Sequence, residues 1–371
     1  MLIGVPREIK PHEHRVGLVP SSVRELVAHG HQVVFEANAG AGIGIDDEAY
    51  RAVGASIVAT AEEIFALAEM VVKVKEPVPS EYRLVREEQI LFTYLHLAAD
   101  LPQTEALLQS GCVAIAYETV TDNRGRLPLL APMSEVAGRM SVQVGAHLLE
   151  KLQGGAGILL GGVPGVHAAK VVVVGGGVSG TNAIRMAMGM EAQVYVIDKS
   201  LDRLYELDFQ FGPMLNTIFS TVAAIEQHVT TADLVIGAVL VPGAAAPRVI
   251  TRAMMRQMRP GSVFVDIAID QGGCAETSRP TTHDNPTYVD EGVVHYCVTN
   301  MPGAVPRTST FALNNATLPF VIALANKGFR KAILDDPHLA NGVNVLHGKL
   351  TSEAVAKSLG LSYTPLKQAL A

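Results

Sequence analysis

Three glycines follow a run of valines at Gly175, Gly177 and Gly180, with a spacing that suits phosphate binding. The first glycine of such a turn allows a tight bend, and the second lets the backbone approach a pyrophosphate. The third lets the next helix pack against the strand. Backbone N–H groups at the helix start then face the phosphates. The sequence therefore predicts a buried strand over 170–174, a phosphate-binding turn and a helix over 181–189.

A carboxylate beyond this turn points to a dinucleotide. The apolar run 192–197 ends in Asp198, about 20 residues beyond the glycines, where an acid binds a ribose 2′-hydroxyl. Asp198 would repel a 2′-phosphate, which favours NAD over NADP, although the neighbouring Lys199 weakens that preference. The simpler alternative is a glycine turn of an ordinary α/β domain, followed by an Asp that ends a strand.

Four more polar side chains stand where a second ligand would bind. Lys75, His96 and Asp270 follow predicted strands, and Arg15 lies in the loop after the first one. Ligands of open parallel sheets bind outside the carboxyl ends of the strands. Two cations suit a carboxylate, and an imidazole suits acid–base chemistry beside a carboxylate that relays a proton. By position alone, Lys75 and Arg15 could be solvated surface cations, and His96 is one of 12 histidines in the chain. Asp270 could simply cap a turn before Gly272 and Gly273.

Short apolar runs alternate with helical segments along the whole chain, which predicts a doubly wound α/β fold with mainly parallel sheets. The predicted strands are 2–5, 32–36, 56–59, 70–74, 90–95, 113–117, 170–174, 192–197, 233–239, 262–269 and 293–298. The predicted helices with both ends defined are 62–68, 102–110, 134–152, 181–189 and 309–326. Three further helices are predicted by one end or by a cap: one capped by Ser21 or Ser22 that ends at Gly30, one that starts near Asp46, and one that ends near Glu88. Shorter helices are expected at the C-terminus.

Composition limits the class of protein. A chain of 371 residues predicts about two domains, and a net charge of −7 without a basic block argues against nucleic acid as a partner. We expect no signal peptide and no membrane span, because the first apolar run is short and no long run lacks charges, Pro or Gly clusters. Three scattered cysteines indicate reduced thiols in a cytosol, and no cluster has metal-ligand spacing.

Several longer motifs occur in order along the chain. They are Gly4-Val5-Pro6-Arg7-Glu8-Ile9-Lys10, Arg15-Val16-Gly17-Leu18-Val19-Pro20, Val72-Lys73-Val74-Lys75-Glu76-Pro77, Thr93-Tyr94-Leu95-His96-Leu97-Ala98, Pro132-Met133-Ser134-Glu135-Val136-Ala137-Gly138, Asp266-Ile267-Ala268-Ile269-Asp270-Gln271-Gly272-Gly273 and Thr299-Asn300-Met301-Pro302-Gly303-Ala304-Val305-Pro306. Through them the sequence resembles the NAD-dependent alanine dehydrogenases, of the alanine dehydrogenase and transhydrogenase α-type family, almost from end to end.

The resemblance implies a role for each matching residue. His96 would be the acid–base group at the substrate oxygen, and Asp270 would assist proton transfers to water and ammonia. Arg15 and Lys75 would bind the carboxylate of alanine or pyruvate. The pocket would be lined by Tyr94, Met133 and Asn300. The nucleotide would be held by Ser134, Gly175, Gly177, Val178, Gly180, Asp198, Arg203, Ser220, Val239, Leu240, Ile267, Asp270 and Met301.

The resemblance also implies a reaction and an organisation. The reaction is the reversible deamination of L-alanine to pyruvate and ammonium, with hydride transfer to NAD and hydrolysis of the imine. Residues 1–130 and 305–371 would form a substrate domain, and 131–304 an NAD-binding Rossmann domain entered through a long helix. A cleft between the two domains would close on the substrates. The expected protein is a cytoplasmic homohexamer without a metal. The alternatives are a transhydrogenase-type hydride shuttle and an NAD(H)-sensing module.

Overall fold

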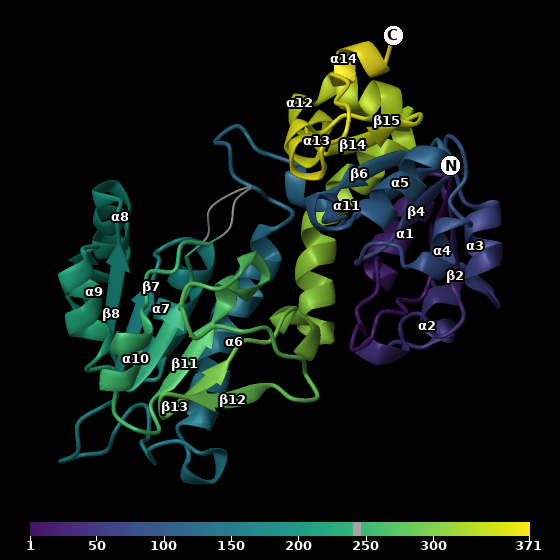
Figure 1. Cartoon of the computed structure of the whole chain (residues 1–371). Helices are drawn as coiled ribbons and strands as arrows, with labels where there is room; N and C mark the ends of the chain where they lie inside the picture. The colour runs from purple at the N-terminus through teal and green to yellow at the C-terminus, as the bar shows by residue number, and fades with distance from the viewer. Residues whose placement is uncertain (240–245) are drawn as a thin grey trace. The chain divides into compact units, whose positions relative to one another are not determined.

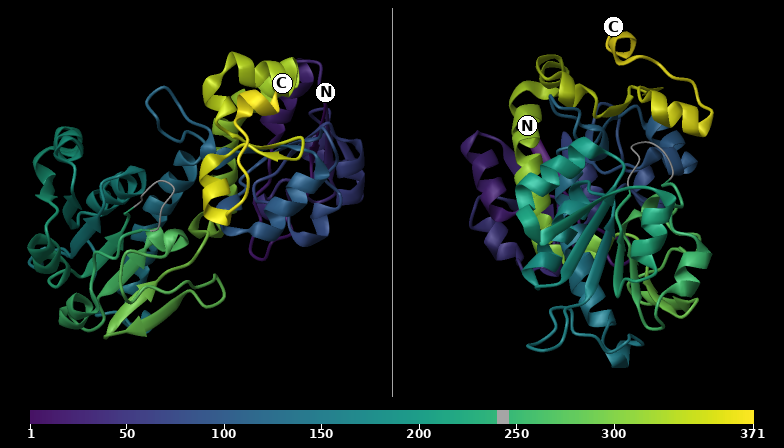
Figure 2. Two further views of the ribbon diagram at one scale, coloured as in Figure 1. Left: turned by 45° about the horizontal axis from the view of Figure 1, so that its top comes forward. Right: turned by 90° about the vertical axis from the view of Figure 1, so that its left-hand side faces the viewer.

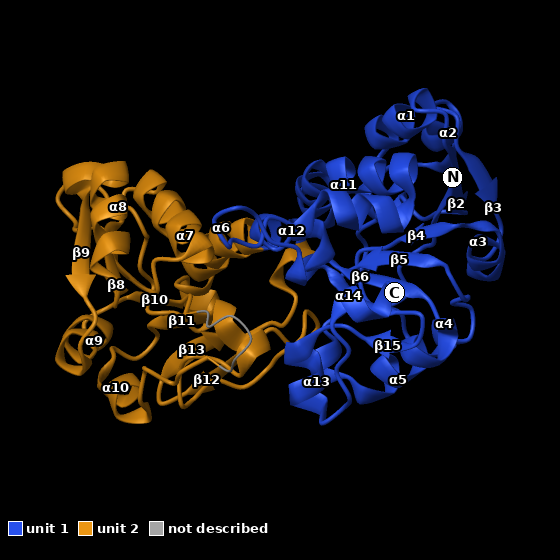
Figure 3. Ribbon diagram, turned by 90° about the horizontal axis from the view of Figure 1, so that it is seen from above, with its two compact units in different colours: residues 1–133, 305–371 blue, residues 134–304 orange. Residues whose placement is uncertain are grey.

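The computed structural model describes residues 1–239 and 246–371 (Figure 1). These residues form two compact units, coloured separately in Figure 3. Unit 1 comprises residues 1–133 and 305–371, and unit 2 comprises residues 134–304. One boundary falls inside helix α6 (Ala131–Leu148), and the other falls between η7 (Met301–Ala304) and α11 (Pro306–Asp335). Unit 1 is therefore built from two separate stretches of the chain.

The strands that the structure describes in unit 1 form an eight-stranded sheet in the order β15-β14-β6-β5-β4-β1-β2-β3. Strands β1 to β6 are parallel, and β14 and β15 extend the sheet antiparallel beyond β6. The strands are β1 (Leu2–Val5), β2 (Gln32–Glu36), β3 (Ser56–Val58), β4 (Met70–Val72), β5 (Ile90–Thr93), β6 (Val113–Ala116), β14 (Val343–Leu346) and β15 (Lys349–Leu350). The strand order reverses between β1 and β4, which is where a doubly wound sheet binds its ligand.

Helices accompany this sheet. They are α1 (Pro20–Ala28), η1 (Ala41–Ile43), α2 (Asp47–Arg51), α3 (Ala61–Leu67), α4 (Pro79–Tyr82), η2 (Leu97–Ala99), α5 (Leu101–Ser110), η3 (Tyr117–Thr119), α11, α12 (Pro337–Ala340), α13 (Glu353–Leu359) and α14 (Leu366–Ala369). Every residue of β4, β5 and β6 is buried, as expected for parallel strands covered on both faces. Helix α11 contains a break at Gly328, whose φ of 71° is outside the helical region.

The described strands of unit 2 form a seven-stranded sheet in the order β12-β13-β11-β10-β7-β8-β9, seen in the right-hand view of Figure 2. All pairs are parallel except β12 with β13. The strands are β7 (Lys170–Val174), β8 (Gln193–Asp198), β9 (Leu215–Phe219), β10 (Leu234–Gly237), β11 (Val263–Asp266), β12 (Thr287–Asp290) and β13 (Val293–Tyr296). The helices, besides α6 and η7, are η4 (Lys151–Gln153), α7 (Val178–Gly189), α8 (Leu201–Phe211), η5 (Gly212–Met214), α9 (Val222–Val229), α10 (Arg252–Gln257) and η6 (Ile267–Gln271). The order reverses between β7 and β10, so unit 2 repeats the plan of unit 1.

The structure confirms the predicted α/β class and corrects several elements. The helix expected to end near Glu88 is only α4, because Arg86 and Gln89 instead donate hydrogen bonds to the carbonyls of Phe65 and Ala68. The predicted serine cap of the first helix is wrong. Helix α1 begins at Pro20, a favoured first residue, after an N-cap without a side-chain bond.

The predicted strands also need correction. Strand β11 ends at Asp266 rather than at 269, because the Asp266 carboxylate accepts the N–H of Ala268 and starts η6. Strands β9 and β12 were not expected, and neither were β14 and β15, in a region predicted to be helical. Strand β14 depends on pairing with β6, more than 200 residues earlier in the sequence, which no local pattern reveals.

Candidate active site

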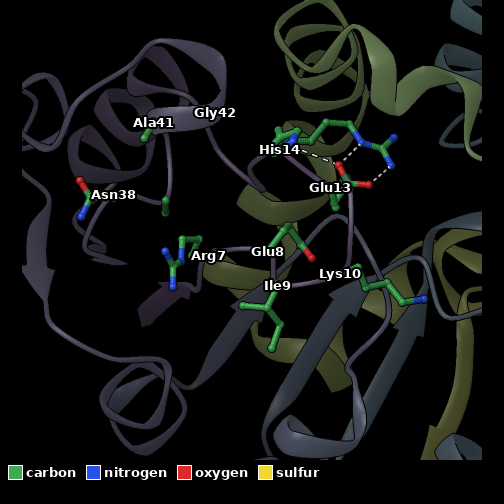
Figure 4. A pocket seen from close by; sticks show the side chains of 11 residues that line it. Arg7, Glu8, Ile9, Lys10, Glu13, His14, Asn38, Ala41 and Gly42 are labelled. Carbon is green, nitrogen blue, oxygen red and sulfur yellow. Dashed lines mark hydrogen bonds and ion pairs between the residues drawn. The ribbon is translucent and has the colours of Figure 1, made fainter. Parts of the chain in front are cut away.

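The loop after β1 carries Arg15, which is 2% exposed and faces a carboxylate from the same loop. Arg15 Nε donates to Glu13 Oε1 at 2.7 Å, and Nη2 donates to Oε2 at 2.5 Å (Figure 4). Arg15 Nη1 lies 3.0 Å from the sulfur of Met133. Burial alone would raise the pKa of Glu13, but the hydrogen bonds and charge of Arg15 lower it. The guanidinium is therefore fixed by a bidentate ion pair, beside one of the expected pocket residues.

The main chain at Lys75, just beyond β4, is held from two sides. Glu8, in the loop after β1, accepts the N–H groups of Val74 at 2.6 Å and Lys75 at 3.2 Å on one carboxylate oxygen. The hydroxyl of Thr93 on β5 donates to the carbonyl of Lys75 at 3.0 Å. The two predicted carboxylate-binding cations thus stand on the two loops that flank the reversal in strand order, β1 to β4.

A buried charge cluster underlies this loop pair, and sequence reasoning missed it. Lys73, 1% exposed, has its ammonium 2.9 Å from Glu81 Oε1 and 3.4 Å from Glu8 Oε2. Burial lowers the pKa of Lys73, but the two carboxylates outweigh it and the pKa is raised. Burial also raises the pKa of Glu8, against the charge of Lys73. The one signal in the sequence is a Lys between two valines at the end of an apolar strand.

His96 follows β5 in a left-handed conformation, with φ 51° and ψ 34°. The N–H of His96 donates to Glu118 at 2.6 Å, and the preceding N–H of Leu95 also donates to that carboxylate. The imidazole stacks on the ring of Tyr94, with centroids 5.7 Å apart. Its Nδ1 lies 3.5 Å from Glu76 Oε2. Backbone and ring are therefore each fixed by a separate carboxylate.

The charges around His96 favour its protonated form. The His96 side chain is 47% exposed. Partial removal of its ring from water lowers its pKa, but the contact with Glu76 and the charge of Glu118 outweigh this effect, and the pKa is raised. Burial likewise raises the pKa of Glu76, but His96, Lys75 and Lys10 together bring it well below the usual range. An imidazole with this balance is suited to exchange protons near neutral pH.

Tyr94 is 3% exposed, and its hydroxyl donates to the carbonyl of Leu129 at 2.6 Å. Burial raises its pKa, so the phenol stays neutral. Unit 1 thus brings Arg15 to Met133, and Tyr94 to His96.

A pocket of about 470 Å³ opens beside the loop after β1 (Figure 4). It is lined by Arg7, Glu8, Ile9, Lys10, Glu13, His14, Arg15, Asn38, Ala39, Ala41 and Gly42. Of the expected substrate residues in unit 1, Arg15 lines it, whereas Lys75, Tyr94 and Met133 do not. Among these four residues, the pocket therefore reaches the predicted substrate position at Arg15 alone.

In unit 2 Gly175 and Gly177 lie in the turn between β7 and α7, and Gly180 lies in the first turn of α7. Gly175 has a φ of 103°, and a Cβ there would lie 2.6 Å from the carbonyl oxygen of Ala238. A Cβ on Gly180 would lie 1.9 Å from the Gly175 oxygen, whereas one on Gly177 would meet nothing within 4 Å. Gly175 and Gly180 are thus required by packing, and Gly177 leaves open space at the helix start, where a phosphate can approach.

Two side chains hold this turn. Asp198, at the end of β8, accepts the N–H of Gly176 at 2.7 Å on one oxygen and the N–H of Ser200 at 2.9 Å on the other. Arg203, on α8, donates to the carbonyl of Gly176 at 2.6 Å and to the hydroxyl of Thr181 at 2.5 Å. Both residues were predicted to contact the nucleotide, and both lie against the glycine turn.

The other expected nucleotide contacts are spread over unit 2. They are Ser134 on α6, Val178 at the start of α7, Ser220 after β9, Val239 after β10, Ile267 in η6 and Met301 in η7. Leu240 lies outside the described residues. Val178 is 44% exposed beside the open space at Gly177.

Asp270 lies in η6, which a second, buried aspartate holds in place. Asp266 accepts the N–H groups of Ala268 and Cys274 at 3.0 Å each and the hydroxyl of Ser278 at 2.5 Å. Burial raises its pKa despite these bonds. This support was not predicted from the sequence, although one short motif contains both acids, with Asp266 four residues before Asp270. Asn300, which follows β13, has a φ of 61°.

Within residues 1–239 and 246–371, no group of three His, Cys, Asp or Glu side chains could hold a metal ion. No helix in those same residues is long and apolar enough to cross a membrane.

The comparisons with known proteins agree over the whole chain. Residues 4–137 match the family described as "Alanine dehydrogenase/PNT, N-terminal domain", and residues 141–353 match its C-terminal domain. The chain belongs to the alanine dehydrogenase/PNT family. Membership in this family implies a nicotinamide cofactor.

Relatives and solved structures give the degree of similarity. The chain is 60% identical to alanine dehydrogenase of Halomonas elongata over 98% of both chains, and 55% identical to that of Mycolicibacterium smegmatis over all of both. A solved L-alanine dehydrogenase matches with a TM-score of 0.94 and 55% identity, over 97% of this chain and 99% of that one. A transhydrogenase from Sinorhizobium meliloti, at 24% identity over 95% of this chain and 100% of that one, has a TM-score of 0.81 and shares the fold.

Proposed function

We propose that the protein catalyses the reversible oxidative deamination of L-alanine to pyruvate and ammonium, with reduction of NAD to NADH. The observation that carries this proposal is the 60% identity, over 98% of both chains, to a relative named alanine dehydrogenase. The side chains required for the chemistry, Arg15, Lys75, His96 and Asp270, are all present. Unit 1 would supply the first three, and unit 2 would supply Asp270 and bind the nucleotide.

The glycine turn of unit 2 fits the pyrophosphate of a dinucleotide. The open space at Gly177 leaves room for a phosphate at the start of α7, where backbone N–H groups are available. The Asp198 carboxylate, beside this turn, would accept a ribose hydroxyl and repel a 2′-phosphate, which favours NAD over NADP. When bound, NAD accepts a hydride from the α-carbon of alanine.

The cations of unit 1 would bind and orient the substrate. Arg15 and Lys75 would hold the carboxylate, since each charge-assisted hydrogen bond contributes about 1.5–3 kcal/mol. Tyr94, Met133 and Asn300 would line the pocket around the small methyl group. This placement would set the α-carbon for hydride transfer, because positioning accounts for much of such catalysis.

His96 and Asp270 would manage the protons. Alanine binds with a neutral amine, and loss of the hydride leaves iminopyruvate. His96 removes a proton from the water that attacks the imine carbon. It then exchanges protons as the carbinolamine releases ammonia and forms the carbonyl of pyruvate. Asp270 assists the transfers to water and ammonia. In the reverse direction, His96 donates to the substrate oxygen as water leaves.

The proposal includes the setting of the enzyme. The three cysteines are free and buried, which suits the reducing cytoplasm. The protein would assemble as a homo-oligomer, a hexamer by resemblance, and it would act on small molecules in amino-acid catabolism.

Absorbance at 340 nm tests the reaction. Purified protein should form NADH from NAD and L-alanine at alkaline pH, and much less product with NADP or with glycine and glutamate. The hydride-shuttle and NAD(H)-sensing alternatives both predict a flat trace together with measurable NAD binding. Substituting His96 by Ala should lower turnover by roughly 10²- to 10⁴-fold and leave NADH affinity nearly unchanged.

A further inference from the structure

Glu76, which follows Lys75 in the loop after β4, lies against the imidazole of His96. One of its oxygens, Oε1, pairs with the ammonium of Lys10, from the loop after β1. The other, Oε2, lies 3.5 Å from His96 Nδ1 and is buried without a shorter hydrogen-bond partner among the described residues. A buried carboxylate oxygen is stable only next to a cation or a donor. Among the described residues, Nδ1 of His96 lies within ion-pair distance of this oxygen and is placed to present a proton to it.

From this geometry we infer that Glu76 is a positioning residue, which holds the proton of His96 on Nδ1 and makes Nε2 the nitrogen that exchanges protons with the substrate. The inference rests on the proposed function, in which His96 is the acid–base group. It assigns Lys10 a supporting role, because an anchored carboxylate cannot turn away from the ring. In neutral histidine one ring nitrogen donates and the other accepts, so the partner of Nδ1 decides which nitrogen can act as the base.

The other groups around the ring do not duplicate this role. Glu118 accepts the backbone N–H groups of Leu95 and His96, so it fixes the main chain rather than a ring nitrogen. Tyr94 stacks on the face of the ring. The charge of Lys75 opposes protonation of His96, and the charges of Glu76 and Glu118 favour it. Among these groups, Glu76 alone lies within ion-pair distance of Nδ1.

The test is Glu76→Gln, which keeps an oxygen that can accept from Nδ1 but removes the charge. The pKa of His96 should fall. In the direction of alanine deamination, the part of the pH profile in which activity rises with pH should move to lower pH. The reason is that His96 reaches its basic form at a lower pH. In the direction of pyruvate amination, the part of the pH profile in which activity falls as pH rises should also move to lower pH. We expect kcat to decrease by about 10- to 100-fold, less than the loss of a whole acid–base group.

Glu88→Gln is the matched control, because Glu88 pairs with Nδ1 of His347 at 3.0 Å on the surface of the same unit. This variant should keep the wild-type pH profile. A Glu76→Gln enzyme with lower activity but an unshifted pH profile would overturn the inference, since a purely structural defect lowers activity without shifting a titration.

A second readout does not depend on turnover. Diethyl pyrocarbonate modifies the deprotonated imidazole, and peptide mass spectrometry can follow its reaction at His96 against pH. Glu76→Gln should shift this reaction profile to lower pH, and an unshifted profile would contradict the inference. If wild-type protein forms no NADH with alanine while the profile still shifts, the Glu76–His96 pairing stands and the proposed function fails.

Discussion

Two residues assigned to the substrate site adopt left-handed backbone conformations, which residues other than Gly rarely take. His96 has a φ of 51° and Asn300 a φ of 61°. Such conformations cost about 1–3 kcal/mol and persist only where the surroundings enforce them. At His96 the enforcing group is Glu118, which accepts two successive N–H groups. The strain is consistent with a side chain whose direction matters more than local stability.

Arg15 gives the first prediction at this scale. In Arg15→Lys the charge remains, but one ammonium cannot reproduce the bidentate contact with Glu13 and also bind a substrate carboxylate. We expect KM for both alanine and pyruvate to rise about 10- to 100-fold, equivalent to one lost charge-assisted hydrogen bond. The Kd for NADH should change little. Steady-state kinetics in both directions and NADH fluorescence measure these values.

The control for this prediction is Arg24→Lys, at an exposed position on α1. It should behave as wild type. Unchanged KM values in Arg15→Lys would remove Arg15 from the carboxylate site.

The glycine turn makes a prediction at the scale of an element, because two of its glycines face different surroundings. Gly180→Ala places a methyl group 1.9 Å from a backbone oxygen, so α7 must move away from the turn. It should lower both Tm and NADH affinity. Gly177→Ala meets no protein atom within 4 Å. It should keep Tm close to wild type but weaken NADH binding by 10-fold or more, because the methyl group occupies the space left for a phosphate.

Thermal unfolding and fluorescence titration of the two variants separate these effects. Equal NADH affinity in Gly177→Ala and wild type would show that no phosphate approaches this glycine.

The end of β4 makes a second prediction, about stability. In Lys73→Met, the buried carboxylates of Glu8 and Glu81 lose their shared cation. Removing one partner of a buried ion pair costs about 3–5 kcal/mol. Burial already raises the pKa of Glu8, and loss of Lys73 raises it further. A raised pKa in the folded state means that stability falls as pH rises through it, so the deficit should be larger at pH 8 than at pH 5.5.

Urea unfolding at both values of pH measures the deficit. Lys349→Met, an exposed Lys on β15, serves as the surface control. A deficit that is the same at both pH values would mean that Glu8 does not take up a proton when Lys73 is lost.

The parts of the fold and of the candidate site that the sequence predicts are those that depend on residues close together in the chain. Local patterns predict the apolar strands β1, β2, β7 and β8. They also predict the glycine turn, because its backbone leaves no room for a Cβ at Gly175 and Gly180. Strand β14 and the cluster around Lys73 depend on partners from distant segments. The roles of Arg15 and His96 came from resemblance, whereas their carboxylate partners Glu13 and Glu76 became visible only in three dimensions.

At the scale of the whole molecule, the two units share one order of parallel strands. The order 3-2-1-4-5-6 recurs in the parallel strands of both units, with each reversal flanked by the loops that carry the assigned residues. Unit 1 is completed only when the chain returns at residue 305 and β14 pairs with β6. Folding of unit 1 therefore requires contacts between the two ends of the sequence.

The last prediction concerns assembly. The segment from η4 to the start of β7 exposes a series of apolar side chains: Leu152 is 96% exposed, Leu159 66%, Val163 53% and Val166 64%. Such a group suits an interface between copies of the chain. Light scattering after gel filtration should give the mass of a homo-oligomer, six chains by resemblance. Leu159→Glu with Val166→Glu should reduce that mass, whereas Leu67→Glu, at a 51%-exposed position on α3, should not. A wild-type protein that remains monomeric at micromolar concentration would contradict the proposed oligomer, and a double variant of unchanged mass would place the interface elsewhere.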